Sequence, residues 1–307
     1  MNLSGHPTGV PRADSLAPLG ADSREHLVAS DNPMQLDGIE YVEYRTARPQ
    51  ALGQVLELMG FRPVARHRSR EVALYRQGDM NVIVNAHPGR GTHALPLPES
   101  PTLFAIALRV RDAAAAYRRA CDLGAWDVPV EVQPMELHIP AIHGVGTTRI
   151  YFVDRYREFS IYDVDFVPIP GVDRQPPAVA GLRWFGIVQY IGAGRTADWV
   201  TFYGHLFGFR ERGADREPGV LPAGSVLQSP DGQWQLQLVE PDAPGDDAPE
   251  AYQRVALGAA DVPAAAATLT ARGVQFVESP GLRVQARGAL TQSWLGGLMF
   301  ELVHQGR

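Results

Sequence analysis

Hydrophobic and polar residues follow one another in an order that predicts the same set of elements twice. In the first half, alternation over residues 38–45 predicts a half-buried strand, and apolar spacing over 49–59 predicts a helix that Gly60 ends. A second helix is predicted at 113–123. Further strands are predicted at 72–75, 81–85, 103–110, 130–132, 149–154 and 159–166.

The second half has the same order. Its helices are predicted at 196–206 and 262–272. Its strands are predicted at 184–191, 226–227, 234–239, 252–257, 282–287, 289–293 and 298–304. Each half thus contains two units of one strand, one helix and several strands, which we write βαβββ. Such a mixture, with few regular parallel crossover units, favours an α+β fold.

Short sequence matches indicate that the two halves are copies of one ancestral domain. The matches are Gly38-Ile39 with Gly186-Ile187, the run 58–62 (LMGFR) with 206–210 (LFGFR), and Ala107-Leu108 before Asp112 with Ala256-Leu257 before Asp261. All three pairs are 148 or 149 residues apart, and three chance matches at one spacing are improbable. We therefore infer a duplicated domain.

The length of 307 residues fits two domains of ordinary size. Residues 1–31 are rich in Pro, Gly, Ala, Ser and Asp without periodicity, which predicts a mobile tail. Residues 168–181 are dense in Pro and Gly, which predicts a linker. The N-terminal domain is therefore placed at 32–167 and the C-terminal domain at 182–307.

Composition restricts the class of protein. The chain is 45% apolar and 20% charged, as globular proteins are, and its net charge of -6 comes without a basic cluster, which argues against a nucleic-acid partner. A small ligand is expected instead. The single Cys121 can form no intrachain disulfide, and no segment has the length of a membrane span or the pattern of a secretory signal. We expect a cytoplasmic protein that does not bind membranes.

Collinear stretches of the first half resemble bacterial 4-hydroxyphenylpyruvate dioxygenases. They are Asn32-Pro33-Met34, His67-Arg68-Ser69-Arg70, Leu74-Tyr75-Arg76-Gln77-Gly78, Pro134-Met135-Glu136-Leu137, Pro140-Ala141-Ile142 and 161–166 (IYDVDF). The second half is similar over Gly181-Leu182, Phe202-Tyr203, Phe209-Arg210, Gln285-Ala286-Arg287-Gly288 and Phe300-Glu301. The resemblance implies tandem vicinal oxygen chelate domains, each with two βαβββ modules that curl a mixed sheet around a cavity. Relatives of this fold commonly associate, so a homo-oligomer is expected.

The family's metal site can be compared with this chain one position at a time. In the dioxygenases, two His and one Glu of the second domain hold Fe(II) and leave positions for substrate and oxygen. The resemblance places the first ligand at Gly186, or at Ile187 if the gap is shifted, the second at Arg254 and the third at Glu301. A glycine offers no ligand atom and a guanidinium only donates, so Glu301 alone is retained. We therefore expect no metal and no cofactor, with Glu301 free to act as an acid or base.

Three interpretations of Arg254 remain open. It can pair with Glu301, it can bind the carboxylate of an aromatic acid through two parallel hydrogen bonds, or its guanidinium can simply extend into solvent from a strand end. Gln189, on the same predicted strand as the first ligand position, is a candidate replacement ligand. Gln285 and Gln292 match polar pocket residues of the dioxygenases, although glutamines on strands often face solvent.

Two other pairs of polar residues carry no function. His138 and His143 lack further ligands that could converge on a metal, and Asp163 and Asp165 would share one face of the predicted strand 159–166. The family carries both segments as structure.

Three functions follow. The first is a metal-free protein derived from the dioxygenases that binds a small aromatic or 2-oxo acid, either as a binding protein or in non-oxidative chemistry. The second is an active Fe(II)-dependent dioxygenase with a rearranged site. The third is a non-catalytic partner subunit that uses the duplicated sheets for assembly.

Overall fold

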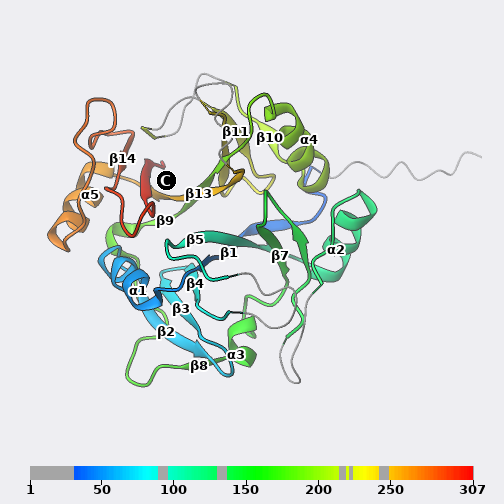
Figure 1. Ribbon diagram of the computed structural model, residues 1–307, viewed down its shortest axis with the longest axis horizontal. Coiled ribbons are helices and arrows are strands. Elements are labelled where there is room, and N and C mark those ends of the chain that lie inside the picture. The colour runs from blue at the N-terminus through cyan, green and yellow to red at the C-terminus, as the bar shows by residue number, and fades with distance from the viewer. Residues whose placement is uncertain are drawn as a thin grey trace, which may run out of the picture. The chain divides into compact units, whose positions relative to one another are not determined.

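The computed structural model describes residues 31–88, 96–129, 137–213, 219–220, 224–241 and 249–306. The predicted mobile tail lies outside the described residues except for its last position, and so does the predicted strand 130–132. The described chain forms two mixed β-sheets with helices, which is the α+β arrangement that the resemblance implies (Figure 1).

The N-terminal sheet has the strand order β6-β7-β5-β1-β4-β3-β2-β8. Strand β1 pairs in parallel with β4, and β5 pairs in parallel with β7, while the remaining pairs are antiparallel. Its elements are β1 (Leu36–Arg45), α1 (Pro49–Leu58), β2 (Arg62–His67), β3 (Val72–Gln77), β4 (Met80–Asn85), β5 (Thr102–Val110), α2 (Ala113–Asp122), β6 (Ala141–His143), β7 (Arg149–Val153), α3 (Ile161–Asp165) and β8 (Phe166–Pro168).

The C-terminal sheet has the order β10-β11-β12-β9-β13-β15-β14, with β9/β12 and β13/β15 parallel. It follows the short helix η2 (Val179–Gly181). Its elements are β9 (Arg183–Tyr190), α4 (Thr196–Phe207), β10 (Arg210–Glu211), β11 (Ser225–Gln228), β12 (Gln235–Val239), β13 (Ala251–Ala259), α5 (Val262–Ala271), β14 (Gly288–Leu290) and β15 (Phe300–His304).

The internal repeat is visible in the way the helices begin and end. Asp112 and Asp261 occupy equivalent N-cap positions of α2 and α5, where each carboxylate accepts a hydrogen bond from a backbone N–H three residues on. Gly60 and Gly208 follow α1 and α4 with φ of 103° and 80°, a left-handed conformation that glycine adopts without strain. The same sequence signals therefore begin and end the same elements in both halves.

Helix capping gives a first prediction. Replacing Asp261 with Ala leaves the Ala264 N–H at the start of α5 without its carboxylate partner, which lies 2.9 Å away. We expect the free energy of unfolding to fall by about 1 kcal/mol, measured by urea denaturation. Asp261→Asn is the matched control, because its side-chain oxygen still accepts the bond. An equal loss in both variants would contradict the capping role.

Strand register corrects one pairing between the halves. The sequence match equates Gly38 with Gly186, but β13 places Ala256 opposite Gly186, whereas β5 places the equivalent Ala107 opposite Tyr41. Gly186 therefore corresponds to Tyr41 and not to Gly38. The two first strands are equivalent, but short gaps shift their residue correspondence.

Two predicted strands are wrong. Residues 161–165 form α3, which begins at a capping box in which the Ser160 backbone and hydroxyl bond to the Asp163 carboxylate. Asp163 and Asp165 therefore do not share a strand face. Residues 282–287 form turns instead of a strand, and the edge strand of this sheet is the three-residue β14. In both cases local turn chemistry overrides the apolar alternation.

The second module of each half keeps the predicted order. In the described chain it contains one strand, one helix and two more strands, with an isolated bridge beside them in each half. These bridges join Asp127 to Ile142 and Phe276 to Thr291. The strand predicted at 130–132 lies outside the described residues.

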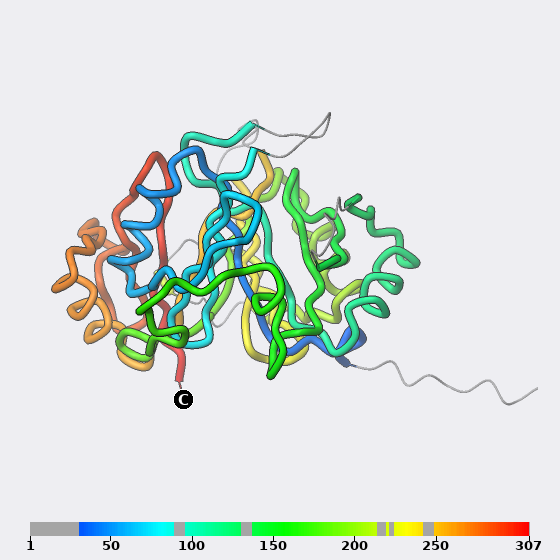
Figure 2. The backbone as a smooth tube through the Cα atoms, turned by 90° about the horizontal axis from the view of Figure 1, so that it is seen from below, coloured from blue at the N-terminus to red at the C-terminus, as the bar shows by residue number. Residues whose placement is uncertain are grey.

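The two halves share one hydrophobic core. It contains residues of both sheets and of the helices between them, and the rings of Phe152 and Phe207 lie 6.3 Å apart across it. Helices α1 and α5 lie side by side (Figures 1 and 2), and Arg272 donates to the carbonyl oxygens of Glu57 and Leu58 at the end of α1. Both contacts join residues far apart in the sequence.

The predicted linker, 168–181, is tied to the N-terminal sheet. Gly78 donates its backbone N–H to the Pro176 carbonyl oxygen at 2.8 Å, and the Gln77 side chain accepts from the Val179 N–H at 2.8 Å. These bonds hold the predicted linker against β3 and the turn after it.

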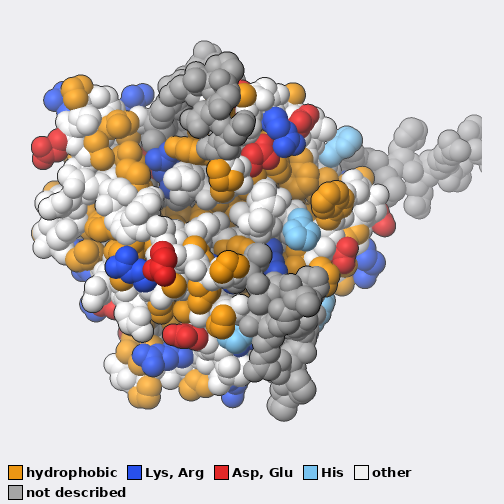
Figure 3. Space-filling model, viewed as in Figure 1, with side chains coloured by type: hydrophobic (Ala, Val, Ile, Leu, Met, Phe, Trp, Pro, Cys, Tyr) orange, Lys and Arg blue, Asp and Glu red, His pale blue; other side chains and the backbone are white. Residues whose placement is uncertain are grey.

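On the face shown in Figure 3, basic and acidic side chains are interspersed and not gathered by sign. In the part of the chain that the structure describes, no helix is both long and apolar enough to cross a membrane.

Candidate functional site

The two faces of the C-terminal sheet differ in chemistry. One face packs into the shared core through side chains such as Ile187, Val255 and Leu302. We call the opposite face the polar face. It carries Val188, Tyr190, Arg254, Ala256, Glu301 and Val303 on the three neighbouring strands β9, β13 and β15, with Gln235 and Gln237 on β12.

The three positions that the resemblance equates with iron ligands meet on this polar face. Ala256 on β13 pairs with Gly186 on one side and with Glu301 on the other, and Arg254 lies one step of the two-residue strand period away from Ala256. The shifted alternative at Ile187 would place the first ligand in the shared core, on the wrong face.

Glu301 is buried, with 2% of its surface exposed. Its Oε1 accepts a hydrogen bond of 3.2 Å from the Val220 N–H, and Gly219 approaches so closely that a Cβ atom there would overlap the carboxylate. Burial raises the pKa of Glu301 to about 7, and the Val220 bond and the charge of Arg254 only partly oppose this shift. Near neutral pH the carboxyl group can therefore either donate or accept a proton.

Arg254 is also buried, at 7% exposed, and its guanidinium nitrogens differ in whether they have a hydrogen-bond partner. One terminal nitrogen, Nη2, donates to the Tyr190 hydroxyl at 2.8 Å, and the guanidinium carbon lies 5.6 Å from the centre of the same ring. The buried Nε has no hydrogen-bond partner. Within the described residues no ion pair joins Arg254 to Glu301, so the interaction between them is electrostatic at longer range.

The side chains at the positions that the resemblance equates with iron ligands do not suit ferrous iron. Gly186 has no donor atom, and a Cβ atom there would overlap the backbone carbonyl oxygen of Gln235 on β12. Arg254 carries a positive charge and only donates. Among the residues that the structure describes, no group of three His, Cys, Asp or Glu side chains could hold a metal ion. One carboxylate does not make a facial triad.

The three candidate glutamines do not join Arg254 and Glu301. Gln189 points from β9 into the shared core, where its Oε1 accepts from the Tyr203 hydroxyl at 2.7 Å. Gln285 lies in the turns before β14 and donates to the Gly281 carbonyl oxygen at 3.0 Å. Gln292 is exposed, with its amide 3.5 Å from the Phe276 carbonyl oxygen.

Sequence reasoning missed the polar residues of β12. Gln235 and Gln237 lie on the polar face, while Leu236 and Leu238 between them pack into the shared core. The Gln-Leu-Gln-Leu alternation over 235–238 is the signal that places two amides on one strand face.

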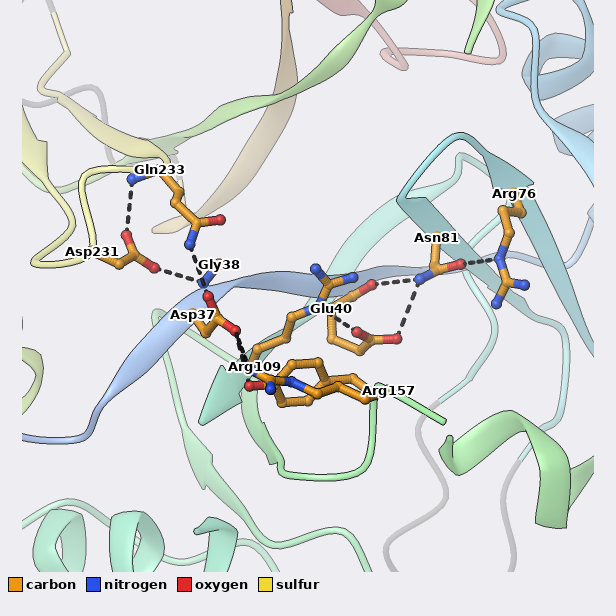
Figure 4. Close-up of polar contacts among 10 residues, drawn as sticks. Asp37, Gly38, Glu40, Arg76, Asn81, Arg109, Arg157, Asp231 and Gln233 are labelled. Carbon is orange, nitrogen blue, oxygen red and sulfur yellow. Dashed lines mark hydrogen bonds and ion pairs between the residues drawn. The ribbon is translucent and has the colours of Figure 1, made fainter. Parts of the chain in front are cut away.

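The N-terminal sheet also buries charged residues that the sequence analysis passed over. Figure 4 shows Glu40 on β1 bonded to Arg109, 2.6 Å away, and to Asn81, whose side chain accepts in turn from Arg76. Burial raises the pKa of Glu40, and Arg109 opposes the shift. A glutamate within an apolar strand pattern was the available signal. Each group here has a partner, so the network is structural.

Figure 4 also shows a polar contact between the two halves of the chain. The Gly38 N–H donates to the Asp231 carboxylate at 2.6 Å, and the Gln233 amide donates to the Asp37 carboxylate at 3.0 Å. Gly38 has φ of 90°, and a Cβ atom there would crowd the Gln233 side chain. The contact therefore requires glycine at this position.

Each half of the chain matches a known protein family. Residues 30–167 match the family described as "Hydroxyphenylpyruvate dioxygenase, HPPD, N-terminal". Residues 185–291 match the "Glyoxalase/Bleomycin resistance protein/Dioxygenase superfamily".

Curated relatives include dioxygenases and other proteins. A 4-hydroxyphenylpyruvate dioxygenase of Pseudomonas sp. is 41% identical over 70% of this chain and 61% of its own length. One from Pseudomonas aeruginosa is 32% identical over 82% of this chain and 74% of its own length. A 3-dehydroshikimate dehydratase of Pseudomonas aeruginosa is 36% identical over 73% of this chain but only 38% of its own length. The chain thus spans about three fifths of the first of these relatives.

Solved structures show the same fold. A fusion protein of a xylose isomerase-like TIM barrel and a 4-hydroxyphenylpyruvate dioxygenase aligns with a TM-score of 0.69 and 25% identity, over 89% of this chain and 50% of the fusion. A variant of 4-hydroxymandelate synthase from Streptomyces coelicolor aligns with a TM-score of 0.69 and 18% identity, over 89% of this chain and 94% of that one.

Proposed function

Because the chain belongs to the 4-hydroxyphenylpyruvate dioxygenase family of the glyoxalase/bleomycin resistance/dioxygenase superfamily, we propose that its polar face binds a small aromatic or 2-oxo acid without iron. The protein is then a binding protein or a catalyst of non-oxidative chemistry. Two of the family's three ligand positions hold Gly186 and Arg254, and neither residue type coordinates Fe(II).

One observation carries the proposal: the buried Nε of Arg254 has no hydrogen-bond partner. An unpaired buried donor costs about 1–3 kcal/mol, and more when charged, so a ligand that accepts its hydrogen bond gains affinity. The edge of a guanidinium presents two parallel N–H groups, which match the two oxygens of a carboxylate. The fold is shared with a fusion protein that includes a 4-hydroxyphenylpyruvate dioxygenase, and the substrate in that enzyme's name is an aromatic 2-oxo acid.

Arg254 is the residue to test. We expect phenylpyruvate to bind the wild-type protein in isothermal titration calorimetry and to bind Arg254→Gln roughly 30-fold or more weakly, because a charged hydrogen bond of about 2 kcal/mol is lost. Arg254→Lys keeps the charge without the paired donors, so it separates loss of binding from loss of folding. Arg118→Gln, at an exposed site on α2, is the control. Equal affinity in wild type and Arg254→Gln contradicts the proposal.

The alternative of an active Fe(II) dioxygenase with a rearranged site has its own test. Protein loaded with ferrous ion under nitrogen is desalted, and its iron content and oxygen uptake with 4-hydroxyphenylpyruvate are measured. We expect neither stoichiometric iron nor oxygen uptake. Stoichiometric iron together with oxygen uptake, both lost in Glu301→Gln, would establish the dioxygenase instead.

A partner subunit is the second candidate function. One observation favours it: a similar domain occurs within longer chains, since this chain covers 38% of a 3-dehydroshikimate dehydratase and 50% of a fusion with a TIM barrel. Analytical ultracentrifugation with and without phenylpyruvate separates a ligand-binding protein from a subunit. We further propose a homo-oligomer and a cytoplasmic location, the latter because Cys121 is a free thiol.

A further inference from the structure

The N-terminal sheet has a face that corresponds to the polar face of the C-terminal sheet. Its centre is Ala107 on β5, which pairs with Tyr41 on β1 and with Tyr151 on β7. These three strands are neighbours in the sheet (Figure 1). By the same register, Tyr41 and Tyr151 stand at the positions equivalent to Gly186 and Glu301. This half therefore presents different chemistry on the equivalent face.

The next row of this face carries two opposite charges. Ala105 on β5 pairs with Glu43 on one side and with Arg149 on the other. Neighbouring strands lie about 4.8 Å apart, so the Cα atoms of Glu43 and Arg149 are roughly 10 Å apart. Ala105 has no polar side-chain atom between them, and no ion pair within the described residues joins the two charges. They attract each other only at longer range.

Glu43 is buried, but only one of its carboxylate oxygens is bonded. The residue is 6% exposed, and its Oε1 accepts a hydrogen bond of 2.7 Å from the Asn85 amide. Burial raises the pKa of Glu43, while the Asn85 bond and the charges of three nearby arginines oppose the shift. Among the residues that the structure describes, Oε2 has no partner, and it is not one of the fully enclosed polar atoms. Unlike Glu40, Glu43 therefore has an accessible oxygen to offer.

Arg149 has donors to offer from the other side of the row. Its Nη1 donates to the Tyr151 hydroxyl at 3.3 Å, and its guanidinium carbon lies 5.1 Å from the centre of the Phe104 ring. Its other nitrogens have no hydrogen-bond partner in the part of the chain that the structure describes. Both Arg149 and Tyr151 are partly exposed, so a ligand can approach from this side.

A buried hydroxyl without a partner lies beside the two charges. Tyr41 is 6% exposed, and its hydroxyl makes no hydrogen bond within the described chain. Its electrostatic neighbours include Tyr151, Glu43 and Arg149, so it faces the same row. A buried hydroxyl without a partner is unfavourable, and a ligand that bonds to it gains affinity.

A ligand of this row must carry both charges. A lone anion is attracted by Arg149 but repelled by Glu43, and a lone cation meets the reverse. An α-amino acid carries an ammonium group and a carboxylate on one carbon atom, so it can bridge charges that do not reach each other. The rings of Tyr41 and Tyr151, whose centres lie 6.2 Å apart, offer an apolar surface for its side chain.

We propose that the row of Glu43, Ala105 and Arg149 binds a free α-amino acid with an apolar side chain. The ammonium group donates to Glu43 Oε2, and the carboxylate accepts from Arg149 and from the Tyr41 hydroxyl. The side chain packs against the two tyrosine rings. This site belongs to the N-terminal half and does not depend on the proposed function of the polar face.

The test compares amino acids with analogues that lack one charged group, titrated calorimetrically into the full chain. The amino acids are L-leucine and L-phenylalanine. Their analogues are 4-methylpentanoate and 3-phenylpropionate, without the ammonium group, and 3-methylbutylamine and 2-phenylethylamine, without the carboxylate. We expect at least one amino acid to bind about tenfold or more tightly than both of its analogues, because each analogue leaves one charge of the row without a partner.

Two variants assign the charges to their residues. In Glu43→Gln the amino acid should bind no more tightly than its analogue without the ammonium group. This variant removes a buried charge and keeps an oxygen for Asn85, so its fold is not endangered. In Arg149→Gln the amino acid should bind about tenfold or more weakly. Glu71→Gln, at an exposed site in the same half, should bind as wild type does.

Arg254→Gln separates this site from the polar face. It should bind the amino acid as wild type does, even where phenylpyruvate binding is lost. The proposal is overturned if neither amino acid shows saturable binding, or if the analogues bind as tightly as the amino acids. Unchanged affinity in Glu43→Gln or Arg149→Gln overturns it too, and so does a loss of amino acid binding in Arg254→Gln.

Discussion

Replacing Glu301 with Gln should stabilise this protein at pH 8 by about 3 kcal/mol. Burial raises the pKa of the Glu301 carboxyl from 4.5 to about 7, which means that the folded protein resists ionising it. Gln keeps an oxygen that accepts the Val220 N–H and carries no charge to bury. Urea denaturation of both proteins across pH 4 to 8 measures the difference.

The pH dependence follows from proton linkage. Below pH 4.5 the carboxyl is protonated in both folded and unfolded chains, so it contributes no pH dependence. Between pH 4.5 and about 7 the folded chain holds the proton and the unfolded chain releases it, so stability falls as pH rises. Above about pH 7 the folded chain releases the proton as well, so stability falls no further. The stability of Glu301→Gln should therefore equal that of the wild type below pH 4.5 and exceed it above about pH 7.

Glu278→Gln is the matched control, because Glu278 is exposed in the same half of the chain. It should follow the wild-type curve at every pH. If Glu301→Gln instead lowers stability at pH 8, the carboxylate is ionised and held by Arg254, and these two residues form a buried pair after all.

The fold followed from sequence where patterns were long and local. The 3.6-residue spacing of α1 and α4 and the alternation of β9 and β13 match the predicted ranges within a few residues. Short predicted segments did not match the structure as well, because only a few residues carry the pattern in each of them. Residues 161–165 alternate like a strand, yet Ser160 and Asp163 form a capping box that begins a helix.

The site was only partly predictable for a different reason. The resemblance to the family pointed to Gly186, Arg254 and Glu301, and the strand register brings all three to one face. Which partner Arg254 has depends on side-chain geometry across strands, and it proved to be Tyr190. The orientation of Gln189 depended on strand parity, which sets it on the face opposite Arg254.

Replacing Gly186 with Ala should lower the free energy of unfolding by about 3 kcal/mol, because overpacking in a close-fitting interior has costs of that size. An added Cβ atom would overlap the Gln235 carbonyl oxygen, which belongs to a backbone and cannot rotate away as a side chain would. Strands β9 and β12 would have to separate. Thermal unfolding and urea denaturation measure the loss.

Gly204→Ala is the matched control within the same half. Gly204 lies in α4, and a Cβ atom there would meet its nearest neighbour at an ordinary 3.6 Å. This change should be neutral or stabilising by up to about 1 kcal/mol, because alanine favours helices. If Gly186→Ala were equally harmless, the strands could accommodate a side chain at the position that the resemblance equates with the first iron ligand. A large loss means that the close approach of the β12 backbone excludes a side chain there.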